Sequence, residues 1–168
     1  MNGTYIASSS SNFNESYKPY MCFNNSNTQI WQSSSLYNSV ENAGIYIGSV
    51  TTIITTPNST ISGEWIQIQL PYSLSLLGYT FLPRSGFLSQ YPKKWYLVGS
   101  NNGSTWYAID YQSESTATAV TYYSYGNSYG NTIFYKYFRV ITTATNNDRS
   151  GANNVVALDE IQLQGIGM

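Results

Sequence analysis

The chemically reactive side chains of this chain are few. It contains no histidine and one cysteine, Cys22, so the Ser-His-Asp and Cys-His arrangements of nucleophilic catalysis cannot be assembled. Zinc sites of the usual Cys/His kind fail for the same reason. A glycosidase needs two carboxylates facing each other across about 5 to 9.5 Å, and the spacing of the acidic residues suggests no such pair. We therefore expect a protein that is not an enzyme. The carboxylates are Glu15, Glu41, Glu64, Asp110, Glu114, Asp148, Asp159 and Glu160.

Arg84 is the residue best suited to hold a polar ligand. It follows Pro83, and its rigid fork of donors matches vicinal sugar hydroxyls or a carboxylate. In one interpretation Tyr91 presents a flat face to a pyranose ring, with Ser89 and Gln90 as polar partners. In the other, Arg84 is tied to loop carbonyls or a carboxylate and Tyr91 packs beneath it. The residues alone leave both interpretations open.

Composition excludes several other classes of partner and location. Seven Lys plus Arg against eight Asp plus Glu give a net charge of −1, which provides no counterion-release term for nucleic-acid binding. The apolar stretches are far shorter than the roughly 20 residues of a transmembrane helix, so we expect a soluble protein. The start of the chain lacks the basic and apolar regions of a secretory signal, and a lone Cys22 allows no internal disulfide.

The elements that must position these residues are strands. In 64–70 the residues Ile66, Ile68 and Leu70 share one face, and Pro71 is expected to end the strand. Residues 94–98 and 105–109 flank Asn102-Gly103, which predicts a hairpin whose tight turn uses positive φ values. Residues 134–141 predict a long central strand, and 156–164 predict the closing strand.

The remaining segments complete an all-β interpretation. The repeat at 125–131 predicts a mobile hairpin tip, and the first third of the chain predicts loops wrapped over the sheets. Short strands separated by Gly-, Asn- and Ser-rich turns are typical of a sandwich or jelly roll. We therefore predict one antiparallel jelly-roll β-sandwich domain over residues 1–168, with residues 1–20 as an N-terminal strand and loops.

Four segments occur in a distinctive order. Residues 23–31 form an Asn-rich loop that leads through Thr28 to Trp31, and residues 63–70 contain a Trp-initiated strand. Residues 79–84 end in Pro-Arg and are followed by the Ser-Asn-Asn-Gly-x-x-Trp hairpin of 96–106. Residues 137–140 and 158–165 supply a Tyr-x-Arg strand and a closing Glu-Ile-x-Leu-x-Gly. Together they resemble the discoidin domain, also called the coagulation factor V/VIII type C domain, and its relatives among carbohydrate-binding modules.

This resemblance implies a galactose-binding-like fold, an eight-stranded antiparallel jelly roll whose loops at one end hold a ligand. The ligand is usually a sugar or, in the clotting factors, a phospholipid head group. The residue matching Arg84 often contacts ligand in sugar-binding relatives. The family also places its Trp residues mostly in the sandwich core, so we expect structural roles for Trp31, Trp65, Trp95 and Trp106.

The resemblance also implies a calcium site. Calcium prefers six to eight oxygen ligands. The family builds such a site from the early loop and the Glu near the C-terminus, positions that fall here on Asn24, Asn27, Thr28 and Glu160. The alternative is that Asn24 and Asn27 make side-chain-to-backbone turns while Glu160 bonds loop amides. In either case we expect these side chains to converge where the first loop meets the last strand.

Three functions remain open at this point. The leading one is a non-catalytic module that recognises glycans for attachment or adhesion. The second is a structural or assembly protein, for example in a virus particle, that uses its surface for protein contacts. The third is binding to a phospholipid surface through Phe87 and Leu88. The sequence does not fix the localisation, which would be a virion for the second function and a cell surface for adhesion.

Overall fold

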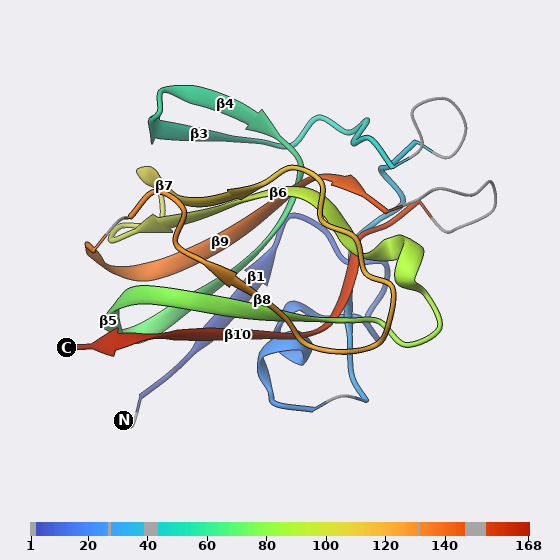
Figure 1. Ribbon diagram of the computed structural model, residues 1–168, viewed down its shortest axis with the longest axis horizontal. Coiled ribbons are helices and arrows are strands. Elements are labelled where there is room, and N and C mark those ends of the chain that lie inside the picture. Colours follow the sequence, from blue (N-terminus) through green and yellow to red (C-terminus); the bar gives the residue numbers. More distant parts are fainter. Residues whose placement is uncertain (1–2, 27, 39–43, 131, 147–153) are drawn as a thin grey trace.

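The computed structural model describes residues 3–26, 28–38, 44–130, 132–146 and 154–168. These residues form ten strands and two short 3₁₀ helices, η1 and η2, in the order shown in Figure 1. The architecture is therefore all-β. The elements are β1 (Ile6–Ser9), η1 (Pro19–Phe23), β2 (Trp31–Gln32), β3 (Thr51–Thr56), β4 (Ser59–Ser62), β5 (Glu64–Pro83), η2 (Leu88–Gln90), β6 (Pro92–Ser100), β7 (Trp106–Gln112), β8 (Tyr123–Gly126), β9 (Phe134–Thr145) and β10 (Ala157–Gly167).

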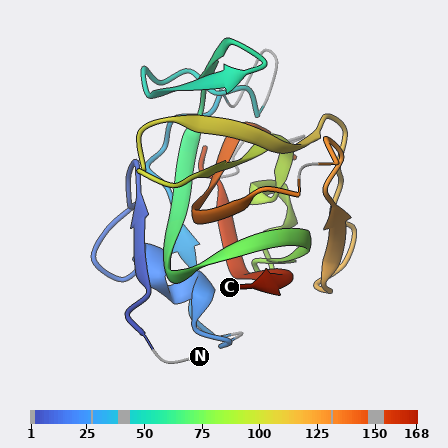
Figure 2. The ribbon, with the colours of Figure 1, turned by 90° about the vertical axis from the view of Figure 1, so that its left-hand side faces the viewer.

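The strands form two layers that share β5. The first layer contains β1, the first half of β5, β9, β6, β7, β3 and β4, and the second contains β2, β10, the second half of β5 and β8. Figure 2 shows β1 and β8 on opposite flanks of the sandwich. The predicted jelly-roll class is confirmed. Within the described strands one pair, β3 with β7, runs parallel, a departure from the fully antiparallel expectation.

Strand β5 corrects one expectation from the sequence. Pro71 does not end it; the strand continues to Pro83. Its pairing with β9 is interrupted between Gln69 and Leu74, so the missing N–H of Pro71 falls in a break of the ladder. From Leu74 onward β5 also pairs with β10, and Leu74 therefore marks its entry into the second layer. The break at this proline coincides with the passage of one strand between the two layers, and Arg84 directly follows the end of the strand.

The core lies between the two layers and matches the period-two pattern. Ile66, Ile68 and Leu70, which were predicted to share one face, are no more than 7% exposed. Trp31, Trp95 and Trp106 are buried as expected, and Trp65 is half-buried. Trp106 is buried on the other face of the first layer. The buried strand residues between the layers include Ile66, Ile68, Leu70, Trp95, Leu97, Phe138, Val140 and Ile161.

The hairpin of β6 and β7 is confirmed, but its turn differs from the expected one. Among the described residues of the turn, Gly103 alone has a positive φ, +73°. Asn102 acts through its side chain instead: its Oδ1 accepts the backbone N–H groups of Ser104 and Thr105 at 2.9 and 2.8 Å. The turn is longer than a two-residue one because the Asn side chain replaces a backbone acceptor.

The expected hairpin tip at 125–131 is wrong for its first residues. Tyr125 belongs to β8, which pairs with β5 along Tyr123–Gly126. Its ring stacks on Tyr79 at 5.3 Å and meets the edge of Trp95 at 4.8 Å. The glycines and asparagines of the repeat are typical of a turn, whereas Tyr123 and Tyr125 of β8 pack against the core.

A second apolar cluster lies on the other face of the first layer, under β3 and β4. We call it the outer cluster; its buried members are Ile54, Val98, Trp106, Ala108 and Ile141. The β3–β4 hairpin stands at the top of Figure 1. Because this hairpin brings Ile54 over the sheet, the first layer buries side chains on both faces.

Candidate functional site

A hollow of about 520 Å³ opens where β5 ends and β10 begins. Its walls come from the loop before η1, the loop after η1, the residues that follow Pro83, and the start of β10. Met21 and Ile30 contribute apolar surface. The polar and aromatic residues that line the hollow include Tyr17, Thr28, Gln29, Arg84, Ser85 and Asp159.

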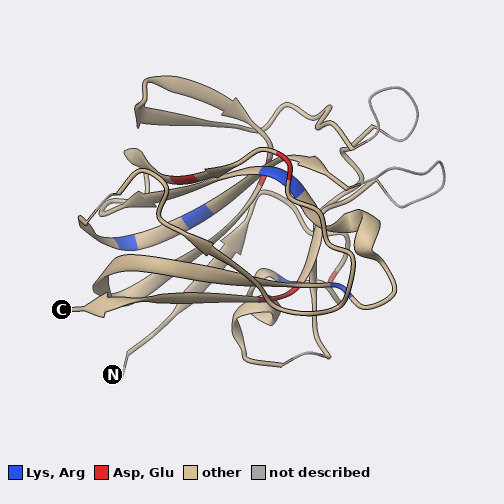
Figure 3. Ribbon diagram, viewed as in Figure 1, with Lys and Arg blue, Asp and Glu red and all other residues tan. Residues whose placement is uncertain are grey.

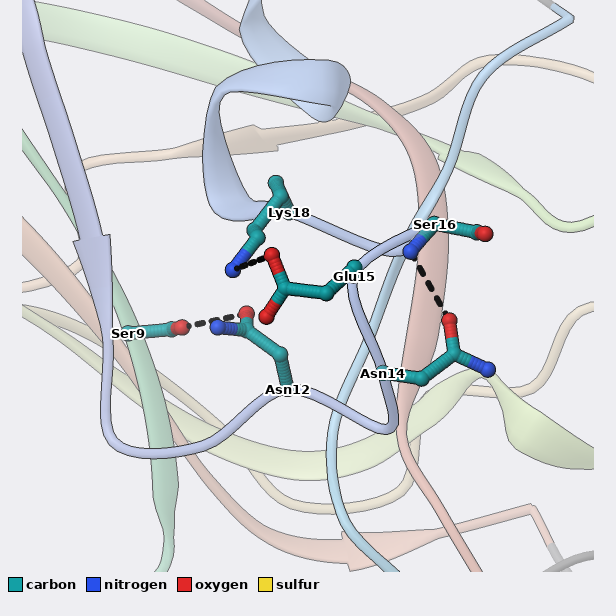
Figure 4. A network of polar contacts seen from close by, with 6 residues as sticks. All are labelled: Ser9, Asn12, Asn14, Glu15, Ser16 and Lys18. Atoms are coloured by element: carbon teal, nitrogen blue, oxygen red, sulfur yellow. Dashed lines mark hydrogen bonds and ion pairs between the residues drawn. The ribbon is translucent and has the colours of Figure 1, made fainter.

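The loop before η1 is fixed by local polar contacts (Figure 4). The Ser9 hydroxyl donates to Asn12 Oδ1 at 2.8 Å, and Asn14 Oδ1 accepts the Ser16 N–H at 2.8 Å. Lys18 and Glu15 form an ion pair at 2.8 Å. These contacts hold the segment that carries Tyr17 to the edge of the hollow.

Arg84 lies in the wall as expected. Its Nη1 donates to Gln32 Oε1 at 2.6 Å and to Gln90 Oε1 at 3.1 Å. The guanidinium lies 4.1 Å from the ring centroid of Phe87 and 5.7 Å from that of Tyr17. Among the residues that the structure describes, Arg84 forms no ion pair. The guanidinium therefore contacts neutral amides and aromatic rings, and its positive charge remains available to a ligand.

The other residues of the predicted loop do not line the hollow. Tyr91 is fully buried, and its hydroxyl meets that of Tyr125 at 2.6 Å. Burial raises the pKa of Tyr91, and its ring offers no face to a sugar. Gln90 is 1% exposed and supports Arg84 from behind, and Ser89 is half-buried. The aromatic that reaches the hollow is Tyr17.

Phe87 and Leu88 differ in their exposure. The Phe87 side chain, 43% exposed, covers the Arg84 guanidinium, and Leu88 is half-buried. No helix within the described ranges is long and apolar enough to span a membrane. Charged residues are few and spread along the ribbon (Figure 3).

Asp159 is a site residue that sequence reasoning missed, as is Tyr17. Asp159 is 3% exposed, lines the hollow, and its Oδ1 has no hydrogen-bond partner in the described part of the chain. Burial raises the pKa of Asp159 to about 6, although the Ser85 amide and the Arg84 charge act in the opposite direction. The available signal was an acidic pair at the start of a buried strand, where paired side chains are the rule.

The loop that carries Asn24 and Thr28 meets β10 at Glu160. Glu160 Oε1 accepts the backbone N–H of Asn25 at 3.2 Å, whereas its buried Oε2 has no partner within the described residues. Asn24 Oδ1 accepts the N–H of Ser26 at 3.0 Å, and the hydroxyls of Thr28 and Ser26 are 3.0 Å apart. Burial raises the pKa of Glu160.

These contacts bear on both interpretations of the loop. Asn24 makes the side-chain-to-backbone turn of the alternative, and Glu160 bonds a loop amide. The unpartnered Oε2 of Glu160 remains suited to a cation. Asn27, the fourth expected ligand, lies outside the described residues. In the described part of the chain, no group of three or more His, Cys, Asp or Glu residues comes together to hold a metal.

The fold can be compared with known structures. The chain is similar to a family 32 carbohydrate-binding module from a family 31 glycoside hydrolase of Clostridium perfringens, with a TM-score of 0.69 and 15% identity. The match covers 96% of this chain and 91% of that module. The chain has the discoidin-type fold. A second C. perfringens module of family 32, solved with GalNAc-β-1,3-galactose, gives 0.65 at 14% identity, covering 95% of this chain and 94% of that one.

An F5/8 type C domain from Bacteroides fragilis gives a TM-score of 0.64 at 13% identity, over 95% of this chain and 89% of that one. The fold expected from the four segments is thus confirmed across nearly the whole chain. No family model matches the sequence, and no curated protein matches it. The resemblance is therefore carried by the backbone and a few motif positions.

Proposed function

We propose that this protein is a non-catalytic glycan-binding module and that the sugar enters the hollow beside Arg84. The observation that carries the proposal is the hollow itself, which is lined by a cation, Arg84, and an aromatic ring, Tyr17. Among the described residues Arg84 has no ion pair, and the Oδ1 of the lining residue Asp159 has no hydrogen-bond partner. Modules of the same fold are described as binding galactose, pectin and chitosan. Sugar sites generally pair apolar surface with a few placed polar groups, as this hollow does.

The residues divide the work of binding. Arg84 donates charge-assisted hydrogen bonds to sugar oxygens, while Gln32 and Gln90 fix its side chain. Tyr17 supplies the apolar ring that the sequence suggested for Tyr91. Asp159 is the carboxylate that lines the hollow among the described residues. One carboxylate does not make the acid and base pair of glycoside hydrolysis, which supports binding rather than cleavage.

The experiment is a glycan array followed by calorimetric titration of the best ligand. Replacing Arg84 by Ala removes hydrogen bonds worth about 1.5 to 3 kcal/mol, roughly a ten- to hundredfold loss of affinity. Lys136→Ala is the matched control, because Lys136 is exposed and does not line the hollow. An array without signal at high protein concentration would count against the proposal and favour the assembly function. Binding to phospholipid vesicles that depends on Phe87 and Leu88 would favour the membrane-surface function.

We also propose that Glu160 takes part in holding a calcium ion. Its Oε2 has no partner among the described residues, and its Oε1 bonds the loop that also carries Asn24 and Thr28; both observations support this proposal. Calcium would tie the loop after η1 to β10 and so steady one wall of the hollow. Calorimetric titration with calcium should give binding that Glu160→Gln abolishes; no heat in the unmodified protein would contradict the proposal.

A further inference from the structure

Phe13 adds an exposed aromatic ring next to Tyr17. Its side chain is 47% exposed, and its ring centroid lies 6.0 Å from that of Tyr17, which lines the hollow. The two rings meet at 73°, so Tyr17 covers at most one face of Phe13. Phe13 therefore extends the aromatic surface beyond the residues that line the hollow.

The backbone of Phe13 is held by the same residue that holds Arg84. The N–H of Phe13 donates to the Gln32 carbonyl at 2.8 Å, while the Gln32 side chain accepts from Arg84 at 2.6 Å. Earlier in the same loop, the Trp31 indole donates to the Ser11 carbonyl at 3.3 Å. The exposed ring thus stands on a loop that is tied to β2, and a ligand that covers it need not order that loop first.

Polar side chains flank Phe13 in the chain. Asn12 and Asn14 use their Oδ1 atoms inside the loop, where they accept from Ser9 and Ser16 (Figure 4). These two bonds do not use the Nδ2 groups, which can donate to sugar hydroxyls. Sugar sites pair an apolar surface with a few placed polar groups, and Phe13 with its two neighbours offers both.

We infer that the ligand is an oligosaccharide of at least two sugar units, one in the hollow beside Arg84 and Tyr17 and the next against the ring of Phe13. This inference rests on the proposed function and adds the length of the ligand to it. The 6.0 Å between the two ring centroids is close to the length of one sugar unit in a chain, so adjoining units can contact adjoining rings.

The test is calorimetric titration with the monosaccharide, disaccharide and trisaccharide of galactose, of glucosamine and of galacturonic acid. In a series that the protein binds, the disaccharide should bind roughly three- to tenfold more tightly than the monosaccharide, because its second unit covers the Phe13 ring. Phe13→Ala should remove this gain and leave the affinity for the monosaccharide unchanged. Phe13→Tyr keeps the ring and should keep the gain.

Tyr129→Ala is the matched control. Tyr129 is 48% exposed, but its N–H donates to Ile109 of β7 and it does not line the hollow, so its loss should change no affinity. Thermal unfolding checks that the variants fold, and Phe13→Leu, which keeps apolar volume without a flat ring, replaces Phe13→Ala if that variant does not fold.

Two results would overturn the inference and leave glycan binding in the hollow intact. One is that disaccharides and trisaccharides bind no more tightly than their monosaccharides. The other is that the folded Phe13 variant loses the same affinity for every length, or for none. Absence of binding in all three series and on the glycan array would instead remove the proposed function, and this inference with it.

Discussion

Arg84 and Arg139 begin with the same chemistry and end in different surroundings. Each guanidinium lies near two aromatic rings, and each donates to a glutamine side chain. Arg139 stands on the outer face of β9, between the rings of Trp65 and Trp106 at 4.0 and 4.1 Å. Its hydrogen bond to Thr52 ties it to β3, and its contact with Trp106 joins it to the outer cluster.

The donors of Arg139 are used inside the protein. Nε and Nη2 donate to Gln67 Oε1 at 3.1 and 2.8 Å, and Nη1 donates to Thr52 Oγ1 at 3.0 Å. Burial lowers the pKa of Arg139. Arg84 instead donates through Nη1 and borders a hollow with an unpaired carboxylate oxygen. Both arginines thus stack on aromatic rings. Arg139 uses its donors inside the protein, whereas Arg84 has donors available beside the unpaired oxygen of Asp159, and this difference distinguishes a candidate ligand site from a structural contact.

The largest effect on stability is expected at Arg139. Arg139→Ala removes two cation–π contacts and leaves Gln67 and Thr52 without their donor. We expect the free energy of unfolding to fall by about 2 to 4 kcal/mol. Urea denaturation measures this change, and calorimetry on the folded fraction should show unchanged ligand affinity. An Arg139 variant with an unchanged free energy of unfolding would show that the outer cluster does not depend on the contacts of Arg139.

The closed interior also has a signature at high pH. Burial raises the pKa of Tyr37, Tyr79 and Tyr91, so these phenols keep their protons in the folded state and lose them in the unfolded state above pH 10. Their stabilisation is complete below the unfolded pKa of about 10 and declines by about 1.4 kcal/mol per pH unit for each tyrosine above it.

Urea denaturation at several values between pH 9 and 11 measures this decline. Tyr91→Phe is the control, because it removes one of the three phenols and should make the pH dependence shallower. A free energy of unfolding that stays constant over this range would show that the tyrosines ionise in place and that the interior is less closed than its packing suggests.

Sequence patterns predicted the buried interior of the sandwich better than the hollow beside Arg84. Alternation of apolar and polar residues identified the inward-facing side chains of β5, β6 and β9, because burial of one sheet face imposes a strict period of two. Pro71 was misleading, since a break in pairing cannot be seen locally. Asp159 and Tyr17 carry no local signal of sharing a site, because the hollow brings them together from opposite ends of the chain. Tyr91 is near Arg84 in sequence, but it is buried in the core.

The comparison of the two arginines is sharpened by lysine substitution, which keeps the charge and removes the planar fork. At Arg139 the planar group fills the space between two indole rings, so Arg139→Lys should lower the free energy of unfolding by about 1 to 2 kcal/mol without changing affinity.

At Arg84 the planar group contacts Phe87 and lines the hollow, and the amide oxygens of Gln32 and Gln90 can accept from an ammonium. Arg84→Lys should therefore leave stability within about 0.5 kcal/mol of the unmodified protein and weaken ligand binding by about 1 kcal/mol, roughly fivefold. Thermal unfolding and calorimetry on both variants give the two quantities. Equal losses of stability at both positions, with affinity unchanged at Arg84, would mean that the arginines do the same structural work and that the ligand site lies elsewhere.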